Sequence, residues 1–351
     1  MKFVHASDLH IDSPLRGLVR YEGADVAAIR TATRRAFVGL VDLCIEEKAA
    51  FLLLAGDIFD GDWKDYGTGL FFASELSRLR AADIPVVLVR GNHDAASQIT
   101  RHLKLPDNVR ELSVHAPESY ELPAAGVVVH GQSFATRAVR SDLAYGFPRA
   151  VSGAFNVGLL HTSADGREGH ENYAPCNVQT LVDKRYDYWA LGHIHQREVL
   201  HREPYVIFPG NLQGRHAREL GAKGATLVTV EDGVIQSVEH RELDVVRWEI
   251  VSVDASDAQS GADAVDLARA ALDRARDAAE GRTLAARVIV KGATRAHAAL
   301  RSSTEQYTAE IRAAANDVGD IFVENVVFAT ETPVDLAQVR EQNDAIGHLA
   351  R

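Results

Sequence analysis

The amino-acid sequence predicts an α/β fold with one large domain and a second, smaller domain. Over residues 1–90, short unbroken apolar stretches alternate with segments of helical spacing, which is typical of a sheet covered on both faces. Residues of metal-binding type directly follow several of these stretches. From residue 244 the pattern changes to a β-α-β-α-β series, and 351 residues suffice to bury two cores.

The first domain begins with a buried strand at the N-terminus. Two further strands follow, each after a helix, and Asp25 is the expected cap of the first helix. The predicted elements are strand Met1–Ala6, helix Asp25–Lys48, strand Phe51–Ala55, helix Gly69–Ala81 and strand Pro85–Val89. Because sites in such sheets lie beyond the carboxyl ends of the strands, we expect the polar residues after these strands to meet.

The remainder of the chain continues the first domain and then forms the second. In the first domain, short β runs from residue 109 lead to strands 155–160, 188–191, 206–208 and 225–230, with a helix at 178–184. In the second, strands 247–253, 285–290 and 321–328 alternate with helices 262–279 and 296–318. The predicted boundaries are therefore 1–243 for the first domain, 244–330 for the second and 331–351 for a polar tail.

Composition and charge restrict the classes of protein. The 46% hydrophobic and 25% charged residues are ordinary for a globular protein. No apolar run is long enough to span a membrane, no signal-peptide pattern is present, and the two cysteines form no C-x-x-C motif, so we expect a cytoplasmic protein without membrane contacts. The net charge of −11 argues against binding polyanions by bulk electrostatics, although metal ions or a partner subunit can supply local positive charge.

Seven residues of metal-binding type stand at the ends of predicted strands. They are Asp8, His10, Asp57, Asn92, His161, His193 and His195. Carboxylate, amide and imidazole without a thiolate suit Mn²⁺, Fe²⁺ or Zn²⁺. Two metal ions that share a bridging carboxylate need about this many protein ligands, and Asp57, in a tight turn after a glycine, is the expected bridge. The spacing leaves open whether His193 and His195 bind one ion or two.

Further residues beside these ligands are expected to assist them. His93 directly follows Asn92 and is predicted to be catalytic, by stabilising the transition state or protonating the leaving group. Asp60 and Asp94 either orient ligands or serve as helix caps or solvated side chains. Arg215 is a candidate phosphate clamp, and His216 a candidate support for the ligands.

Taken together, these motifs resemble the calcineurin-like metallophosphoesterase superfamily. Its pattern of D-x-H, G-D, G-N-H-[DE], H and G-H-x-H matches SDLH, GDIFD, GNHD, LLHTS and GHIH in the same order. GDIFD and GNHD resemble the SbcD and Mre class of DNA nucleases, and differ from the GDxVDRG and GNHE of protein phosphatases. The stretches HASDLHIDSPLRGL, HTSADGREGHENYAPC and PGNLQGRH are similar to the YhaO-like bacterial branch of DNA repair exonucleases.

The resemblance implies a four-layer α/β/β/α sandwich with a small α+β capping domain and two Mn²⁺ ions. One ion would be bound by Asp8, His10, Asp57 and His195, and the other by Asp57, Asn92, His161 and His193, with His93 catalytic. Family members form homodimers and work with an SMC/Rad50-like ATPase through a C-terminal helical segment. This sequence departs from the pattern, because it ends soon after the second domain and has Asp60 where some relatives have a second active-site histidine.

The sequence therefore predicts a two-metal phosphodiesterase that hydrolyses DNA as an exonuclease or endonuclease in DNA repair. One alternative is a phosphodiesterase for a small molecule such as a cyclic nucleotide or a nucleotide sugar. The other is a nuclease-like subunit that regulates an SMC/Rad50-like ATPase, against which the complete set of ligands argues.

Overall fold

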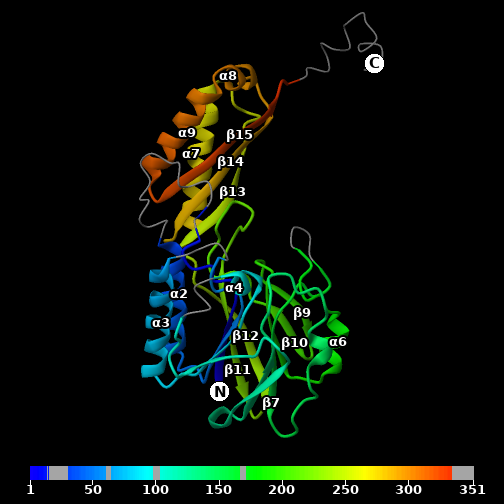
Figure 1. The fold of residues 1–351 in the computed structure, drawn as a ribbon. Coiled ribbons are helices and arrows are strands. Elements are labelled where there is room, and N and C mark those ends of the chain that lie inside the picture. The colour runs from blue at the N-terminus through cyan, green and yellow to red at the C-terminus, as the bar shows by residue number, and fades with distance from the viewer. Residues whose placement is uncertain (14, 16–30, 61–64, 98–102, 167–170, 334–351) are drawn as a thin grey trace, which may run out of the picture. The chain divides into compact units, whose positions relative to one another are not determined.

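The computed structural model describes residues 1–13, 15, 31–60, 65–97, 103–166 and 171–333. These residues divide into two units (Figure 1). Of the described residues, the first unit contains the chain up to Arg215 together with Ala222–Val245. The second contains His216–Gly221 and the chain from Val246 onward.

The first unit is built on two six-stranded sheets. The first sheet has the order β12-β11-β1-β2-β3-β4, in which β1 to β4 are parallel and β11 and β12 are antiparallel to their neighbours. Its strands are β1 (Lys2–Ala6), β2 (Leu52–Ala55), β3 (Val86–Val89), β4 (Val109–Glu111), β11 (Gly224–Glu231) and β12 (Val234–Glu242).

The second sheet has the order β5-β6-β7-β8-β10-β9, with parallel strands in the middle and an antiparallel strand at each edge. Its strands are β5 (Glu118–Leu122), β6 (Val127–Gly131), β7 (Phe155–His161), β8 (Tyr188–Gly192), β9 (Glu198–Arg202) and β10 (Tyr205–Phe208). Two short 3₁₀ turns, Pro123–Ala125 and Ala144–Gly146, lie in its connections.

Apolar residues of both sheets form a shared core between them. Phe3 of β1 stacks on Phe51 at a centroid distance of 4.8 Å and meets Tyr188 of β8 edge-on at 5.2 Å. Helices α2 (Ala32–Glu46) and α3 (Tyr66–Ala81) cover the other face of the first sheet (Figure 1). Helix α6 (Val178–Asp183) packs Leu181 against Trp189 on the other face of the second sheet. This arrangement confirms the predicted α/β/β/α layering.

The second unit has the predicted β-α-β-α-β order. Its three parallel strands are β13 (Val246–Asp254), β14 (Thr283–Ala293) and β15 (Ile321–Glu331). Its helices are α7 (Gly261–Ala278), α8 (His297–Ser302) and α9 (Thr304–Val318). Leu272 and Ile311 of the long helices join Val288 of the sheet in one apolar core.

Several elements differ from the sequence-based expectation. Helix α3 starts three residues early because the Asp65 side chain caps it by accepting a hydrogen bond from the Gly67 amide at 2.8 Å. The helix predicted at 296–318 is interrupted at Ser303, whose φ and ψ of −127° and 42° are not helical. Strands β9 and β12 and the short helix α4 (Asn92–Ala96) were not predicted. The expected Asp25 cap and the tail from residue 334 lie outside the described residues.

Two further observations concern membrane insertion and cysteine chemistry. None of the helices in the described ranges is long and apolar enough to cross a bilayer. Cys44 and Cys176 are both buried and free. Burial raises the pKa of each thiol to about 12, so both are unreactive thiols at neutral pH.

Candidate metal centre

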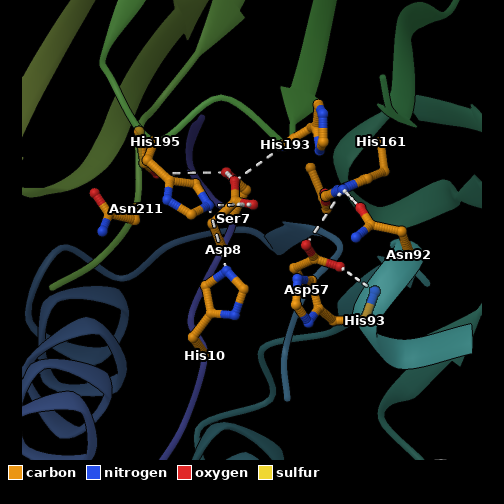
Figure 2. Close-up of polar contacts among 12 residues, drawn as sticks. Ser7, Asp8, His10, Asp57, Asn92, His93, His161, His193, His195 and Asn211 are labelled. Atoms are coloured by element: carbon orange, nitrogen blue, oxygen red, sulfur yellow. Dashed lines mark hydrogen bonds and ion pairs between the residues drawn. The ribbon is translucent and has the colours of Figure 1, made fainter. Parts of the chain in front are cut away.

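The predicted metal ligands meet at the carboxyl ends of parallel strands from both sheets (Figure 2). Three groups of three described residues bring their ligand atoms within 4.8 Å of one another, and two of these groups consist only of predicted metal ligands. We call Asp8, His10 and His195 the first ligand group, and Asp57, His161 and His193 the second ligand group. The shared edge of the two sheets therefore assembles residues that are far apart in the sequence.

Tight turns direct these side chains into the site. Asp8, His10, Asp57 and His193 all have positive φ angles, of 52°, 43°, 52° and 104°. This backbone conformation costs residues other than glycine about 1–3 kcal/mol each and is typical of functional sites. The turns after β1 and β2 support each other, because the amides of Asp8 and His10 donate to the carbonyls of Gly56 and Asp57 at 3.0 and 3.1 Å.

Gly91 is required where the turns of β2 and β3 approach. A Cβ atom at this position would lie 2.2 Å from Oδ1 of Asp57 and 2.8 Å from its backbone nitrogen. The glycine thus allows the Asn92 turn to pack directly against the Asp57 carboxylate.

The first ligand group contains a buried carboxylate oxygen, Oδ1 of Asp8, that accepts no hydrogen bond from the described residues. Oδ2 of Asp8 accepts hydrogen bonds from Ser7 Oγ at 2.6 Å and from the His193 amide at 3.0 Å. Oδ1 is buried and has no hydrogen-bond donor among the described residues. It lies 3.6 Å from Nε2 of His195, which in turn lies 3.3 Å from Nε2 of His10. A buried oxygen without a donor, beside two imidazole nitrogens, fits a divalent cation.

The second ligand group has acceptor atoms that face one another. Nδ1 of His161 donates to the Ala55 carbonyl at 2.9 Å, so a neutral His161 carries a lone pair on Nε2. That lone pair faces Oδ1 of Asn92 at 3.0 Å and Oδ2 of Asp57 at 3.5 Å. Nε2 of His193 donates to the Glu171 carbonyl at 2.8 Å, which leaves its Nδ1 for a metal. Three converging acceptors again fit a cation.

Burial keeps the imidazoles of His10 and His161 neutral, and the fold brings several carboxylates close together. It lowers the pKa of His10 and of His161 to about 3, so both are neutral at pH 7, as metal binding requires. Burial, followed by the neighbouring carboxylates of Asp94 and Asp8, raises the pKa of Asp57 well above its ordinary value. A bound divalent cation would relieve this repulsion, so the residues present fit the predicted metal ions.

His93 is partly exposed and contacts a member of each ligand group. Its side chain is 32% exposed, whereas that of His161 is fully buried. Its amide donates to Oδ1 of Asp57 at 2.9 Å, and its ring meets that of His10 edge-on at 5.1 Å. His93 is thus fixed beside the candidate metal ligands while its imidazole remains within reach of a substrate.

Asp60 connects His10, His93 and Arg215. Its Oδ1 accepts a hydrogen bond from Nδ1 of His10 at 2.7 Å and lies 3.7 Å from Nδ1 of His93. The same oxygen lies 3.5 Å from Nη1 of Arg215, whose Nη2 lies 3.3 Å from Nδ1 of His195. Burial opposes ionisation of Asp60, but His10 and Arg215 outweigh it and hold the pKa of Asp60 below its ordinary value. Asp60 therefore holds His10 in its metal-binding orientation.

Asp94 connects the turn after β2 to the turn after β3. Its Oδ1 accepts from the amides of Ile58 and Phe59 at 2.9 and 3.0 Å, and its Oδ2 accepts from the Gly91 amide at 3.0 Å. Burial raises its pKa to about 6. His216, by contrast, belongs to the second unit, where its Nε2 lies 3.5 Å from Glu219. His216 is not a member of either ligand group.

Two supporting groups were missed from the sequence. The Glu171 carbonyl that binds His193 gives no sequence signal, because every residue has a carbonyl. Lys223 is only 3% exposed, and its Nζ donates to the His195 carbonyl at 2.8 Å. It lies in a glycine-flanked turn away from every motif, and only its burial in the fold reveals it.

Comparisons with known proteins identify the family of the chain. The calcineurin-like phosphoesterase family model matches residues 1–197, and the model of the middle domain of metallophosphoesterase YhaO matches residues 248–331. The uncharacterized metallophosphoesterase YhaO of Bacillus subtilis (strain 168) is 37% identical over 264 residues. That alignment covers 74% of this chain and 64% of the relative.

Two solved structures align with part of this chain at low sequence identity. The protein TT1561 of Thermus thermophilus has a TM-score of 0.41 and 15% identity, over 69% of this chain and 98% of that one. A dimetal phosphatase from Danio rerio has a TM-score of 0.41 and 11% identity, over 69% of this chain and 97% of that one.

Proposed function

Because this chain belongs to the calcineurin-like phosphoesterase family, we propose that it uses two metal ions to hydrolyse phosphodiester bonds in DNA. Membership makes it a metal-dependent phosphoester hydrolase and confirms the resemblance in its motifs. The proposed substrate, a DNA strand cut as an exonuclease or endonuclease in DNA repair, goes beyond the family. The position of His93, half-buried and in contact with Asp57 and His10, is the observation that carries the proposal.

The ligand groups support two metal ions. Asp8, His10 and His195 would hold one, Asn92, His161 and His193 would hold the other, and Asp57 would bridge them. When bound, such ions lower the pKa of a water molecule and polarise phosphoryl oxygens. The oxygen and imidazole donors without a thiolate suit Mn²⁺, Fe²⁺ or Zn²⁺, and the motif resemblance makes Mn²⁺ our choice among them.

His93 is the candidate group that protonates the leaving group. A sugar alkoxide is a poor leaving group, so a diesterase for nucleic acid benefits from a proton donor beside the scissile bond. Burial lowers the pKa of His93, and the carboxylate of Asp60 opposes that effect and favours the protonated imidazole. The hydrogen bond from the His93 amide to Asp57 fixes the imidazole next to the ligand groups. The position of His93, and not its lowered pKa, therefore supports a proton donor beside the departing substrate oxygen.

The biological setting is part of the proposal. The motif resemblance to SbcD and Mre nucleases supports a homodimer that works with an SMC/Rad50-like ATPase. The aligned segment covers only 64% of the YhaO relative, so these partners are proposed from the motifs alone. We further propose a cytoplasmic protein, because its two cysteines are buried and free.

A small phosphodiester is the second candidate substrate. The net charge of −11 favours it, because an acidic protein gains little from attraction to a long phosphate backbone. A short substrate needs only the local charge of the metal ions and Arg215.

The test uses the purified chain, stripped of metal and then supplied with Mn²⁺. End-labelled linear duplex and single-stranded DNA are the substrates, with Asn92→Ala and His93→Ala as controls. Mn²⁺-dependent cleavage that both variants lose supports the proposal. Hydrolysis of bis-p-nitrophenyl phosphate without any DNA cleavage would overturn the DNA substrate and favour the small diester.

A further inference from the structure

The segment 134–139, between β6 and β7, lies along the second ligand group. At its start, the ring of Phe134 meets the ring of His161 at 90° and 5.5 Å. At its end, the Val139 carbonyl accepts a hydrogen bond from the Ala174 amide at 2.7 Å. The segment is thus attached at both ends beside the candidate metal site, with Arg137 in between.

Tyr173 supports this segment from the side of the other ligand. Its ring lies 5.7 Å from that of His193 and packs in one apolar cluster with Phe134 and Ala174. Its hydroxyl donates to the Glu171 carboxylate. Because Glu171 also binds His193 through its carbonyl, the phenol is held rigidly next to a metal ligand.

Arg137 is the exposed cation of this arrangement. Its guanidinium is close enough to affect two groups of the site. It adds to the effect of burial in lowering the pKa of His93. It also opposes the rise in the pKa of Tyr173 that the Glu171 carboxylate causes. No ion pair of Arg137 is found within the described ranges, and the neighbouring Glu171 carboxylate is bound to Tyr173. The side chain of Arg137 also hydrogen-bonds Tyr173, and because a guanidinium has five N–H donors, others remain for an external anion next to His93.

We propose that Arg137 binds the phosphate next to the scissile phosphate of a nucleic-acid strand. The scissile group must reach the ligand groups and His93, so the adjoining phosphate passes the segment that carries Arg137. A guanidinium matches a phosphate with two parallel hydrogen bonds, which suits this position. The inference rests on the proposed function and adds a contact that a single-phosphate substrate cannot make.

Three dinucleotide substrates distinguish binding of the adjoining phosphate by Arg137 from hydrolysis of the scissile bond. Thymidylyl-thymidine (TpT) has only the scissile phosphate, while pTpT and TpTp carry one more phosphate at either end. With Mn²⁺, we expect one of the two phosphorylated forms to have a KM about tenfold below that of TpT. Arg137→Ala should abolish this difference in KM between the phosphorylated forms and TpT, and Arg137→Lys should retain part of it. Arg140→Ala, which removes an exposed arginine from the same connection, is the matched control and should keep the difference.

The outcomes test the Arg137 phosphate subsite separately from the proposed nuclease activity. Cleavage of TpT with no preference for an added phosphate, or with a preference that survives Arg137→Ala, overturns the subsite and leaves the proposed nuclease intact. An equal effect of Arg140→Ala also overturns it, because loop charge would then explain the preference. Hydrolysis of bis-p-nitrophenyl phosphate without cleavage of any dinucleotide or DNA overturns both.

Discussion

The Nε2 atoms of His10 and His195 lie 3.3 Å apart, although 185 positions separate the two residues in the sequence. Nε2 of His195 also lies 3.6 Å from the buried Oδ1 of Asp8, and the three residues bring one ligand atom each within 4.8 Å of one another. Since Nδ1 of His10 donates to Asp60, a neutral His10 directs a lone pair at its partner. The fold thus brings two imidazole nitrogens and a carboxylate oxygen close together, which is the arrangement expected of residues that share a cation.

The protein with bound metal should therefore be more stable against unfolding than the metal-free protein. At a Mn²⁺ concentration about a hundredfold above the dissociation constant, one bound ion adds about 2.7 kcal/mol, which corresponds to a rise of several degrees in Tm. Differential scanning calorimetry measures this rise. Asp8→Asn should reduce it, because the substitution removes the buried carboxylate charge. Equal shifts in the two proteins would contradict the assignment of Asp8.

The pH dependence of stability should report the buried His161. Its pKa is about 3 in the folded protein and near 6.5 when unfolded, so below pH 6.5 the unfolded state binds the proton first. His161 thus costs stability as the pH falls from 6.5 towards 3 and has no effect on the slope above 6.5. In the presence of a chelator, His161→Gln should make the unfolding free energy less steep with pH, by up to about 1.4 kcal/mol per unit. Urea unfolding at pH 4.5, 5.5 and 7.5 measures the slopes, and parallel curves would refute the prediction.

Asp60 should matter for catalysis through the residues that it orients. Asp60→Asn keeps the shape but removes the charge that holds His10 and faces His93 and Arg215. We expect a loss of about 10–100-fold in kcat or in metal affinity, as for other groups that orient metal-binding histidines. Steady-state hydrolysis of bis-p-nitrophenyl phosphate over a Mn²⁺ titration separates the two effects. Activity within twofold of wild type at every Mn²⁺ concentration would show that His10 keeps its orientation without the charge.

Lys223 should position His195 through its backbone. Lys223→Met removes the donor to the His195 carbonyl and should weaken one of two Mn²⁺-binding steps about tenfold while sparing the other. A Mn²⁺ titration followed by electron paramagnetic resonance resolves the steps. Lys223→Arg retains a cation and should recover part of the affinity. Equal weakening of both steps would indicate a general loss of stability instead.

Local patterns predicted much of the fold. Largely apolar runs located β1, β2, β3, β7 and β8, because strands buried on both faces leave few positions for polar side chains such as His5 and Asn156. The same argument fails for β9 and β12, whose residues are mostly half-exposed and largely polar and are stabilised by pairing with β10 and β11. The interruption at Ser303 was equally invisible, because both helices that flank it continue a helical pattern.

The candidate site also has features that the sequence predicts and others that only the fold shows. The sequence by itself determined which residue types stand at strand ends, and hence that Asp8, Asp57 and His193 would face one edge of the molecule, because strand polarity is a local property. Only the tertiary structure decided that Asp60 orients His10, that Glu171 fixes His193 and that Lys223 supports His195. Those contacts join turns far apart in the chain, and their distances depend on how two sheets pack, which no local pattern encodes.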